Sequence, residues 1–323
     1  MTSSKAGRQL FFLLPMLTFL LHKPCAAGFS YAPADTARYI VMAEQSQQRI
    51  VIVDINTGQL VWEWKPASPA VPAAHIAWFS NPSDAKPVLN NQYLLMTASG
   101  GVVALLRIAD KKLVFYAYAG GNTHSAEMLP DGNIVAASST GNYLTVFRVD
   151  TLAAPGDVYK KTIPIAFGHN VVWDRKRNLL WSAGMNTLKS FRYNFNCAYP
   201  DLEPIDSIKL PGTQAHDLFP GYGSKRLWLT NLSHVYLFDP ATRSLQTGPT
   251  LQADIKSVSS APGNAPTILI RPKEKWWTDE VLDAGGKVVF HEAGWKIYKA
   301  RWLLTNSFSY PPGDTIKSGC RIP

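Results

Sequence analysis

A group of short apolar segments recurs along this sequence at intervals of about forty residues, and this repeat restricts the possible folds more than any other feature. The clearest copy is NTHSAEMLPDGNIVAASSTGNYLTVFRVD at 122–150. Its three apolar runs are separated by PDGN and TGN, which are turn sequences. The runs are short and bounded by turns, so each is expected to form a strand. Similar groups begin at His169 and His216.

The period of the repeat indicates the architecture. Equivalent strand starts are separated by 40, 45, 47, 40 and 43 residues along the series Asp84, His124, His169, His216, Lys256 and Lys299. Four short strands at such a period are typical of β-propeller blades. The first group, residues 39–64, has only three strands, and the last strand has none after it. We therefore predict an all-β fold, a six-bladed β-propeller closed by a C-terminal strand that completes the first blade. A β-sandwich is the alternative, but it does not require this repeat.

The N-terminal segment has the layout of a secretory signal. A basic segment precedes the apolar run at 10–21, and small residues follow at 25–27. A membrane anchor is the alternative, although the run is short for a span and contains a proline. We predict a signal peptide at 1–27, a single β-propeller domain at 28–323, and a secreted protein without a membrane partner after cleavage.

The charge balance argues against nucleic-acid binding. The formal net charge is +9, and removal of the signal, with Lys5, Arg8 and Lys23, leaves +6. Such spread-out charge favours solubility rather than a nucleic-acid stripe. The nearest basic run with aromatics, 273–277, is short and includes an acid. We predict a monomer without a nucleic-acid partner.

The mature chain would retain two cysteines, Cys197 and Cys320, because Cys25 leaves with the signal. In an exported protein two cysteines indicate one disulfide, and two free thiols are the alternative. The tail from Leu303 to Cys320 has 17 steps and spans up to about 55 Å when extended. It can therefore cross the face opposite the strand starts and reach Cys197. The sequon at 231–233 also predicts glycosylation in a eukaryotic host.

The first strand of each propeller blade lines the central channel, so the residues that open these strands should form a ring at one mouth. A lining that only had to pack would be small and apolar, whereas this one is rich in histidine and lysine. The ring comprises Lys299 or Arg301, Asp84 or Lys86, His124, His169, His216 and Lys256.

The three histidines and Lys256 are the candidate catalytic residues. Imidazoles of His124, His169 and His216 that converge from three blades can bind one divalent metal ion, the predicted cofactor. They can instead act as general acid or base near neutral pH. The structural alternative is a repeated latch, in which each histidine caps the loop of the adjacent blade.

Three further cations are candidate substrate-binding residues. Lys86, Lys299 and Arg301 would hold an anion such as a carboxylate. The alternative is that the basic ring residues form ion pairs within the channel, with the carboxylates Asp84, Glu127, Asp174 and Asp217.

Four tryptophans, Trp276, Trp277, Trp295 and Trp302, cluster late in the chain. Indole rings can stack on sugars, but packing between blades is the commoner use of such residues. The sequence contains no G-x-S-x-G, H-E-x-x-H, P-loop or dinucleotide fingerprint, which argues against the corresponding hydrolase, zinc-protease and nucleotide-binding classes.

Several motifs together resemble a known family. HSAEMLPDGNIVAASS, HNVVWDRKRNLLW, HDLFP, WWTD and YKARW are similar to the DUF6528 family over nearly the whole mature chain. This resemblance implies an exported β-propeller and no established activity. The ring of histidines is also similar in architecture to oligogalacturonate-lyase-type propellers, which hold a metal on histidine. That likeness assigns no catalytic residue here, because fold does not determine function.

Two functions from different classes are consistent with this ring. The first is a carbohydrate-active enzyme, a lyase whose partner is an acidic oligosaccharide or polysaccharide. β-Elimination from a uronate needs a neutralised carboxylate, a base for the C5 proton and an acid for the leaving oxygen. The second is a non-catalytic propeller that binds a sugar or a protein. A quinone-cofactor dehydrogenase is a third option, since such propellers also use channel histidine, lysine and arginine.

Overall fold

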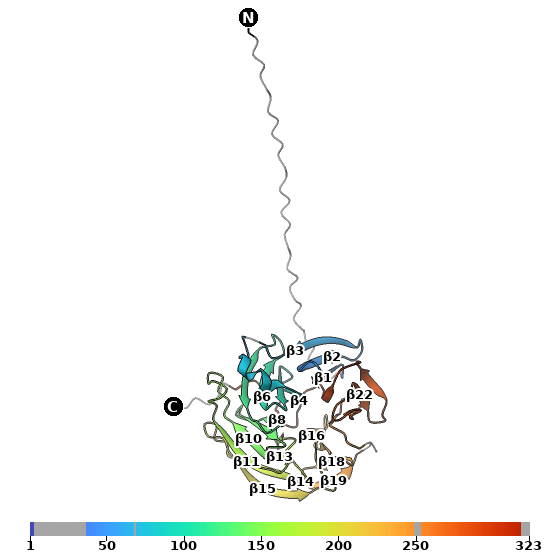
Figure 1. The fold of residues 1–323 in the computed structure, drawn as a ribbon. Helices are drawn as coiled ribbons and strands as arrows, with labels where there is room; N and C mark the ends of the chain where they lie inside the picture. The colour runs from blue at the N-terminus through green and yellow to red at the C-terminus, as the bar shows by residue number, and fades with distance from the viewer. Residues whose placement is uncertain (3–36, 68, 249–252, 318–323) are drawn as a thin grey trace.

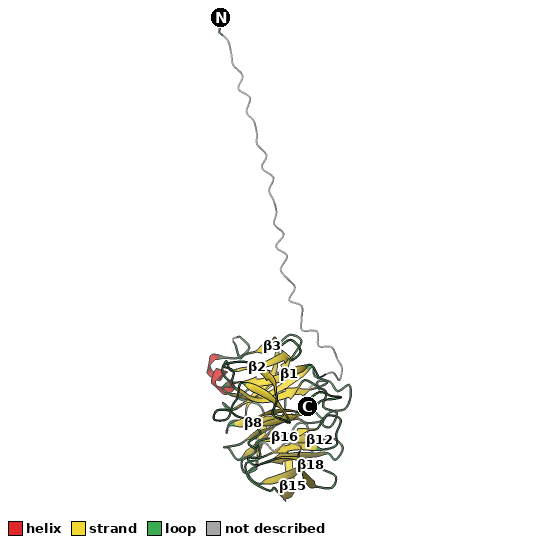
Figure 2. Ribbon diagram, turned by 90° about the vertical axis from the view of Figure 1, so that its right-hand side faces the viewer, coloured by secondary structure: helices red, strands yellow, loops and turns green. Residues whose placement is uncertain are grey.

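The computed structural model describes residues 1–2, 37–67, 69–248 and 253–317. In these ranges the chain forms six four-stranded antiparallel sheets in a ring around a central axis (Figure 1). The one helix described is a short 3-10 helix, η1 (Ala73–Phe79), at the edge of the ring (Figure 2). The predicted all-β six-bladed propeller is confirmed. No helix among the described residues is long and apolar enough to cross a membrane.

Each sheet is one blade, and its strands are named here from the innermost outward. Blade 1 contains β24 (Ile297–Trp302), β1 (Tyr39–Glu44), β2 (Arg49–Asp54) and β3 (Gln59–Trp64). Blade 2 contains β4 (Pro82–Val88), β5 (Tyr93–Ala98), β6 (Val102–Arg107) and β7 (Leu113–Tyr118). Blade 3 contains β8 (Thr123–Met128), β9 (Ile134–Ser138), β10 (Tyr143–Phe147) and β11 (Lys160–Pro164).

The other three blades follow the same order. Blade 4 contains β12 (Val172–Asp174), β13 (Leu179–Ala183), β14 (Thr187–Tyr193) and β15 (Leu202–Lys209). Blade 5 contains β16 (Asp217–Pro220), β17 (Leu227–Thr230), β18 (Val235–Asp239) and β19 (Ser244–Thr247). Blade 6 contains β20 (Ser257–Ser259), β21 (Ile268–Ile270), β22 (Glu280–Asp283) and β23 (Val288–His291).

The ring closes in blade 1, where the last strand of the chain pairs with the first. β24 runs antiparallel to β1, with Ile40 opposite Trp302 and Val41 opposite Arg301. In Figure 1 the blue strands of blade 1 lie beside the orange-red strands of blade 6 at this seam. Because β24 is hydrogen-bonded into the first blade, neither terminal strand leaves an open inner edge. The predicted closure is confirmed.

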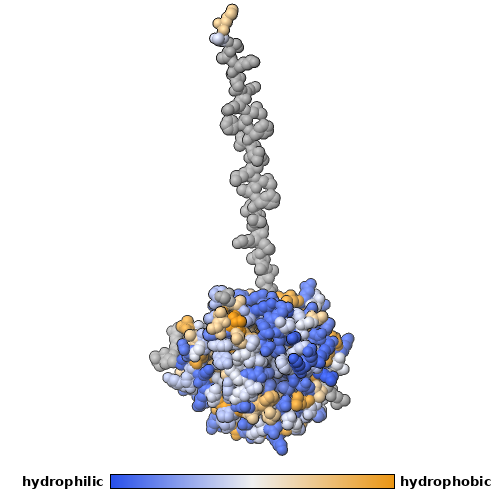
Figure 3. All heavy atoms as spheres, viewed as in Figure 1, coloured by the Kyte–Doolittle hydropathy of each residue, from blue (hydrophilic) through white to orange (hydrophobic). Residues whose placement is uncertain are grey.

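The core consists of apolar layers between neighbouring blades. Each blade packs against another on both faces, so side chains on both sides of a strand are buried. All six residues of β2 and of β5 are therefore buried, and both strands read as nearly continuous apolar runs. Trp302 is fully packed in the layer between blades 1 and 6, with Trp295 partly buried beside it. On the face drawn in Figure 3, apolar residues lie in small groups among polar ones.

The C-terminal segment 303–317 crosses the end of the channel opposite the strand starts. The Tyr310 hydroxyl donates a hydrogen bond to the Glu127 carboxylate inside the channel. Farther along, Asn90 in the β4–β5 loop donates to the carbonyl of Asp314, with the two atoms 3.1 Å apart. The segment thus spans from blade 1 to blade 2 across this face.

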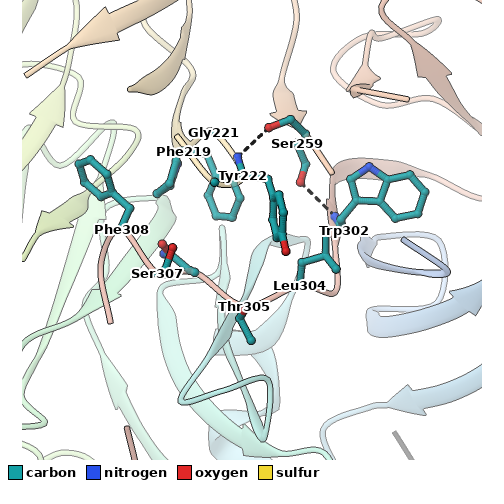
Figure 4. A pocket seen from close by; sticks show the side chains of 13 residues that line it. Phe219, Gly221, Tyr222, Ser259, Trp302, Leu304, Thr305, Ser307 and Phe308 are labelled. Carbon is teal, nitrogen blue, oxygen red and sulfur yellow. Dashed lines mark hydrogen bonds between the residues drawn. The ribbon is translucent and has the colours of Figure 1, made fainter. Parts of the chain in front are cut away.

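Figure 4 shows the start of this segment. Thr305, Ser307 and Phe308 lie near Phe219 of β16 and near Tyr222 in the loop that follows it. The pocket between them has a volume of about 20 Å³, which leaves room for about one water molecule. The segment therefore leaves little space at this point, and two larger pockets, of about 130 and 280 Å³, lie beside it farther along.

Two predictions from the sequence concern surface chemistry. Asn231 of the predicted sequon is only 1% exposed, and its side-chain amide donates to the Pro211 carbonyl at 2.6 Å. This buried placement does not fit a glycosylation site, which needs an accessible asparagine. The predicted signal peptide lies outside the described residues apart from its first two, so export stays a prediction.

Cys197 is disulfide-bonded, and the other two cysteines, Cys25 and Cys320, lie outside the described residues. The described tail ends close to Cys197. A Cβ on Gly132 would lie 3.1 Å from the Lys317 side chain, and the next residue, Asn133, donates to the Cys197 carbonyl at 3.0 Å. This geometry agrees with a Cys197–Cys320 pair, which stays a prediction.

We expect peptide mapping of the purified protein without reductant to recover the Cys197 and Cys320 peptides as one linked species. The bond would close a loop of more than one hundred residues and stabilise the fold by about 4–5 kcal/mol in the chain-entropy model. The double variant Cys197→Ser/Cys320→Ser should therefore unfold at a lower denaturant concentration. Free thiols at both positions in the native protein would contradict this pairing.

Candidate functional site

The inner strands enter one mouth of the channel through a shared backbone conformation. In five blades, a residue with φ between 52° and 61° lies two positions before a residue at the start of the inner strand. The pairs are Asn81 and Ser83, Asn122 and His124, Phe167 and His169, Gln214 and His216, and Asp254 and Lys256. This left-handed conformation is uncommon for phenylalanine and glutamine. The three histidines and Lys256 therefore occupy equivalent positions of the repeat.

Two β-bulges direct further side chains to the same mouth. The pairing of β8 with β9 passes from Thr123 to Ser125 and leaves His124 out of the ladder. The pairing of β24 with β1 leaves Tyr298 out in the same way. A bulged residue is rotated relative to its neighbours, so both side chains reach one another across the mouth. The Tyr298 hydroxyl lies 2.9 Å from His124 Nδ1.

The structure brings the three predicted histidines together at this mouth. The ring centroids are 4.4 Å apart for His124 and His169, and 5.1 Å apart for His169 and His216. Phe167 packs against His169, with ring centroids 4.0 Å apart. The histidines and Lys256 are each 7% exposed or less, and they line a pocket of about 340 Å³. The polar residues of its rim are Gln45, Asn81, Ser99, Asn122, Ser139 and Thr140.

Hydrogen bonds determine which imidazole nitrogens carry protons. His169 Nδ1 lies 3.1 Å from the Phe167 carbonyl, which can only accept, so Nδ1 carries the proton and Nε2 keeps a lone pair. Lys256 Nζ lies 3.0 Å from His216 Nε2 and 2.7 Å from Asp254 Oδ1. An ammonium group can only donate, so His216 Nε2 accepts and Nδ1 carries the proton.

Two buried nitrogens in the pocket wall have no hydrogen-bond partner among the described residues. They are His124 Nε2 and His216 Nδ1. His216 Nδ1 is an N–H donor, and His124 Nε2 is one in the tautomer in which the Tyr298 hydroxyl donates to His124 Nδ1. A buried polar group without a partner costs about 1–3 kcal/mol. The two donors are therefore candidate contacts for a ligand.

The predicted substrate-binding cations do not line this pocket. Lys299 and Arg301 lie deeper in the channel and are each 1% exposed. Arg301 Nη2 is 2.7 Å from Asp217 and 3.2 Å from Asp84, and Lys299 Nζ is 3.3 Å and 3.6 Å from the same carboxylates. The reason is that both cations follow the start of β24 by two to four residues, which carries them below the mouth.

Lys86 is also inside the channel and paired. Its Nζ lies 3.4 Å from Glu127 and 2.6 Å from the Val171 carbonyl. Lys86 therefore forms an ion pair within the channel, as Lys299 and Arg301 do. Lys256 also pairs with an acid, although with Asp254 rather than with one of the predicted partners. The predicted Asp174 partner is used elsewhere, because it pairs with Arg177 at 2.9 Å.

Burial and positive charge keep the mouth histidines neutral. Burial lowers the pKa of His124, His169 and His216, and the ammonium groups of Lys299 and Lys256 lower it further. For His169 the pKa falls to about 3. Burial also lowers the pKa of Lys256, although Asp254 opposes this effect. The imidazoles are therefore hydrogen-bonding groups without charge at neutral pH.

The histidines do not fit a metal site well. Among the described residues, only Asp279, Glu280 and His291 form a group of three ligating side chains whose atoms all lie within 4.8 Å of one another. Lys273 already forms ion pairs with Asp279 at 2.9 Å and with Glu280 at 2.6 Å. At the mouth, an ammonium group lies beside the histidines, which disfavours a cation. A metal on the three histidines stays a prediction that this geometry does not favour.

Three residues of the mouth were missed from the sequence. Tyr298 is the neighbour of the predicted Lys299, and only the bulge turns its side chain toward the histidines. Phe167 and Asp254 both lie two positions before a predicted ring residue, and this spacing could have been noticed in the sequence. The left-handed backbone conformation that these positions share is visible only in the structure.

Comparison with known proteins identifies the family. A family model described as "Family of unknown function (DUF6528)" matches residues 33–317. The chain belongs to the DUF6528 family. Comparison with curated proteins finds no match. For this DUF6528 protein, the mouth residues are therefore the basis for a functional argument.

Solved structures share the fold of this DUF6528 protein. A protein of unknown function from Bacteroides caccae is 14% identical, with a TM-score of 0.56 over 82% of this chain and 98% of that chain. The Cps50 (Swd1) β-propeller domain of Myceliophteria thermophila is 13% identical, with a TM-score of 0.51 over 82% of this chain and 88% of that chain. At such low identity the likeness concerns the fold alone.

We predict that His169 makes the stability of this DUF6528 protein dependent on pH. Its pKa is lowered by burial to about 3 in the folded protein, against about 6.5 when unfolded. The unfolded state therefore binds more protons between these values. The contribution of His169 is complete above pH 6.5 and is lost as the pH falls toward 3. In urea unfolding between pH 6.5 and 4.5, His169→Gln should make the pH dependence shallower, by up to about 1.4 kcal/mol per pH unit.

The matched control is His234→Gln, because His234 is exposed. This variant should follow the wild-type pH dependence. Parallel curves for His169→Gln and the wild type would contradict the assignment of a buried neutral imidazole.

Proposed function

We propose that the channel mouth binds a carboxylate-bearing ligand, and that the ligand is a uronate residue of an acidic glycan. The observation that carries this proposal is a pair of buried, unpartnered imidazole nitrogens, His124 Nε2 and His216 Nδ1, on side chains that line the same pocket as the ammonium group of Lys256. A carboxylate only accepts hydrogen bonds, and charge-assisted bonds to nitrogen are among the strongest in proteins. A ligand carboxylate would therefore accept hydrogen bonds from imidazole N–H groups that have no partner among the described residues.

The rest of the pocket suits a sugar that carries this carboxylate. His169 Nε2 keeps a lone pair that can accept from a hydroxyl group. The rim adds amide and hydroxyl side chains, and Phe167 and Tyr298 supply apolar ring surface. Small-molecule sites typically have about 300–1,000 Å³ and combine apolar walls with a few directed polar groups. A pocket of about 340 Å³ is sufficient for one monosaccharide unit.

β-Elimination from the bound uronate is a second candidate. Two hydrogen-bonded pairs on the pocket wall favour it, Tyr298 with His124 and Lys256 with His216. In this scheme Lys256 neutralises the carboxylate, and His169 Nε2 takes the C5 proton. The bound anion would raise the low pKa of His169 toward the working range. The electron pair of the C5–H bond forms the C4=C5 double bond as the C4–O bond breaks. His124 Nε2–H gives its proton to the leaving oxygen, and His124 Nδ1 takes a proton from the Tyr298 hydroxyl. This scheme needs no metal.

Titration calorimetry with D-galacturonate and D-galactose tests the binding proposal. The two sugars differ in the carboxylate at C6, so galacturonate should bind at least about tenfold more tightly, equivalent to 1.4 kcal/mol. Lys256→Met should remove most of this preference. Lys287→Met is the matched control, since Lys287 is exposed on the β22–β23 turn, and it should bind like the wild type.

Three results would contradict the proposal. They are no binding of galacturonate, equal affinity for both sugars, and wild-type affinity in Lys256→Met. Mixing the wild-type protein or a variant with oligogalacturonate tests the elimination scheme separately. Growth of the ultraviolet absorbance of an unsaturated uronate, abolished by His169→Gln, would support it, and binding without such a product would leave a non-catalytic binding protein.

A further inference from the structure

We infer that the site continues into a second sugar subsite on the indole of Trp276, so that the ligand is an oligosaccharide rather than a single uronate. This inference rests on the function proposed above. Trp276 is 47% exposed, whereas Trp62 and Trp302 are 2% and 1% exposed. An exposed indole at the rim of a polar pocket offers a flat apolar surface of the kind on which a pyranose ring stacks.

The chain holds this indole in a fixed position. Trp276 lies in a tight hairpin at 274–277, whose tip residue Lys275 has φ of 52°. Trp276 Nε1 donates to Gln45 Oε1 at 3.1 Å, and Gln45 Nε2 donates in turn to the Pro82 carbonyl at 3.0 Å. The indole is therefore tied through Gln45 to the start of the inner strand of blade 2. A preformed position reduces the entropy that a ligand must pay on binding.

Trp276 belongs to two cavities at once. Together with Gln45 and Asn81 it lines both the histidine pocket and a neighbouring groove of about 530 Å³. The histidine pocket and the groove thus lie on either side of shared residues, and we expect a longer ligand to extend over the indole from one to the other. The size of the groove is within the range of small-molecule sites.

The chemistry of the groove suits a second unit of an acidic glycan. Two lysines, Lys275 and Lys296, and one acid, Glu274, line it. Lys296 Nζ lies 4.7 Å from the centre of the Trp277 ring, so its charge is held at the wall. Gln45, Gln48 and Asn81 supply side-chain amides that can bond to sugar hydroxyls. Aromatic, amide and basic groups thus line the groove together, and a stacked, negatively charged sugar could use all three.

Calorimetry with D-galacturonate and trigalacturonate tests this extension. The wild type should bind the trimer at least tenfold more tightly than the monomer. Trp276→Ala should lose about tenfold in affinity for the trimer and less than twofold for the monomer, because the monomer lacks the second ring that would stack on the indole. Trp276→Phe retains a ring and should recover most of the loss. Tyr199→Ala is the control, since Tyr199 is 54% exposed and lines neither cavity.

The outcomes separate this inference from the function on which it rests. Failure of the monomer to bind would overturn the proposed function itself. Binding of the monomer with no gain for the trimer, and no effect of Trp276→Ala, would overturn only the second subsite. An equal loss for both ligands in Trp276→Ala would also overturn it, because Trp276 would then only support the pocket through Gln45. A thermal unfolding curve for each variant establishes that it is folded.

Discussion

The buried ion cluster on the propeller axis is the interaction on which the rest of the structure depends. Arg301 comes from β24, Asp84 from β4 and Asp217 from β16, so one guanidinium group joins three blades. Burial would raise the pKa of both aspartates, but Arg301 and Lys299 outweigh it and keep both pKa values below their usual range. Removing one partner would leave an unpaired buried charge, which costs about 3–5 kcal/mol. The cluster therefore fixes β24, the strand that closes the ring.

The same cluster organises the mouth above it. Lys299 Nζ lies 3.5 Å from the His124 carbonyl and 3.4 Å from the His216 carbonyl. The charge that closes the ring thus also contacts the backbone of two mouth histidines, and it adds to the burial that lowers the pKa of their side chains. At the other end, Tyr310 from the tail bonds to Glu127. The histidine pocket, where the unpartnered nitrogens lie, is at the opposite mouth.

The repeat determined how much of this could be predicted. Six blades and the closing strand follow from strand spacing, because a period near forty residues leaves few other ways to bury apolar runs on both faces. The histidines could also be placed, since they begin equivalent strands. The depth of Lys299 and Arg301 in the channel could not be predicted. A shift of two or four residues along an inner strand moves a side chain from the mouth to the buried cluster.

Local backbone irregularity explains what the sequence did not reveal. Tyr298 reaches the mouth through a bulge, and a strict alternation of side chains would have turned it away. Trp276 is in a hairpin tip whose direction depends on the bond to Gln45, a residue more than two hundred positions earlier. Contacts of this kind depend on tertiary structure. They also bring neutral imidazoles and Trp276 to the same pocket.

A crystal structure of the protein soaked with galacturonate tests the central claim most directly. The account predicts the sugar in the histidine pocket, with its carboxylate about 3 Å from Lys256 Nζ and accepting from the free N–H of His124 or His216. Galacturonate bound at another surface, or bound in the pocket with its hydroxyls rather than its carboxylate toward Lys256, would contradict it.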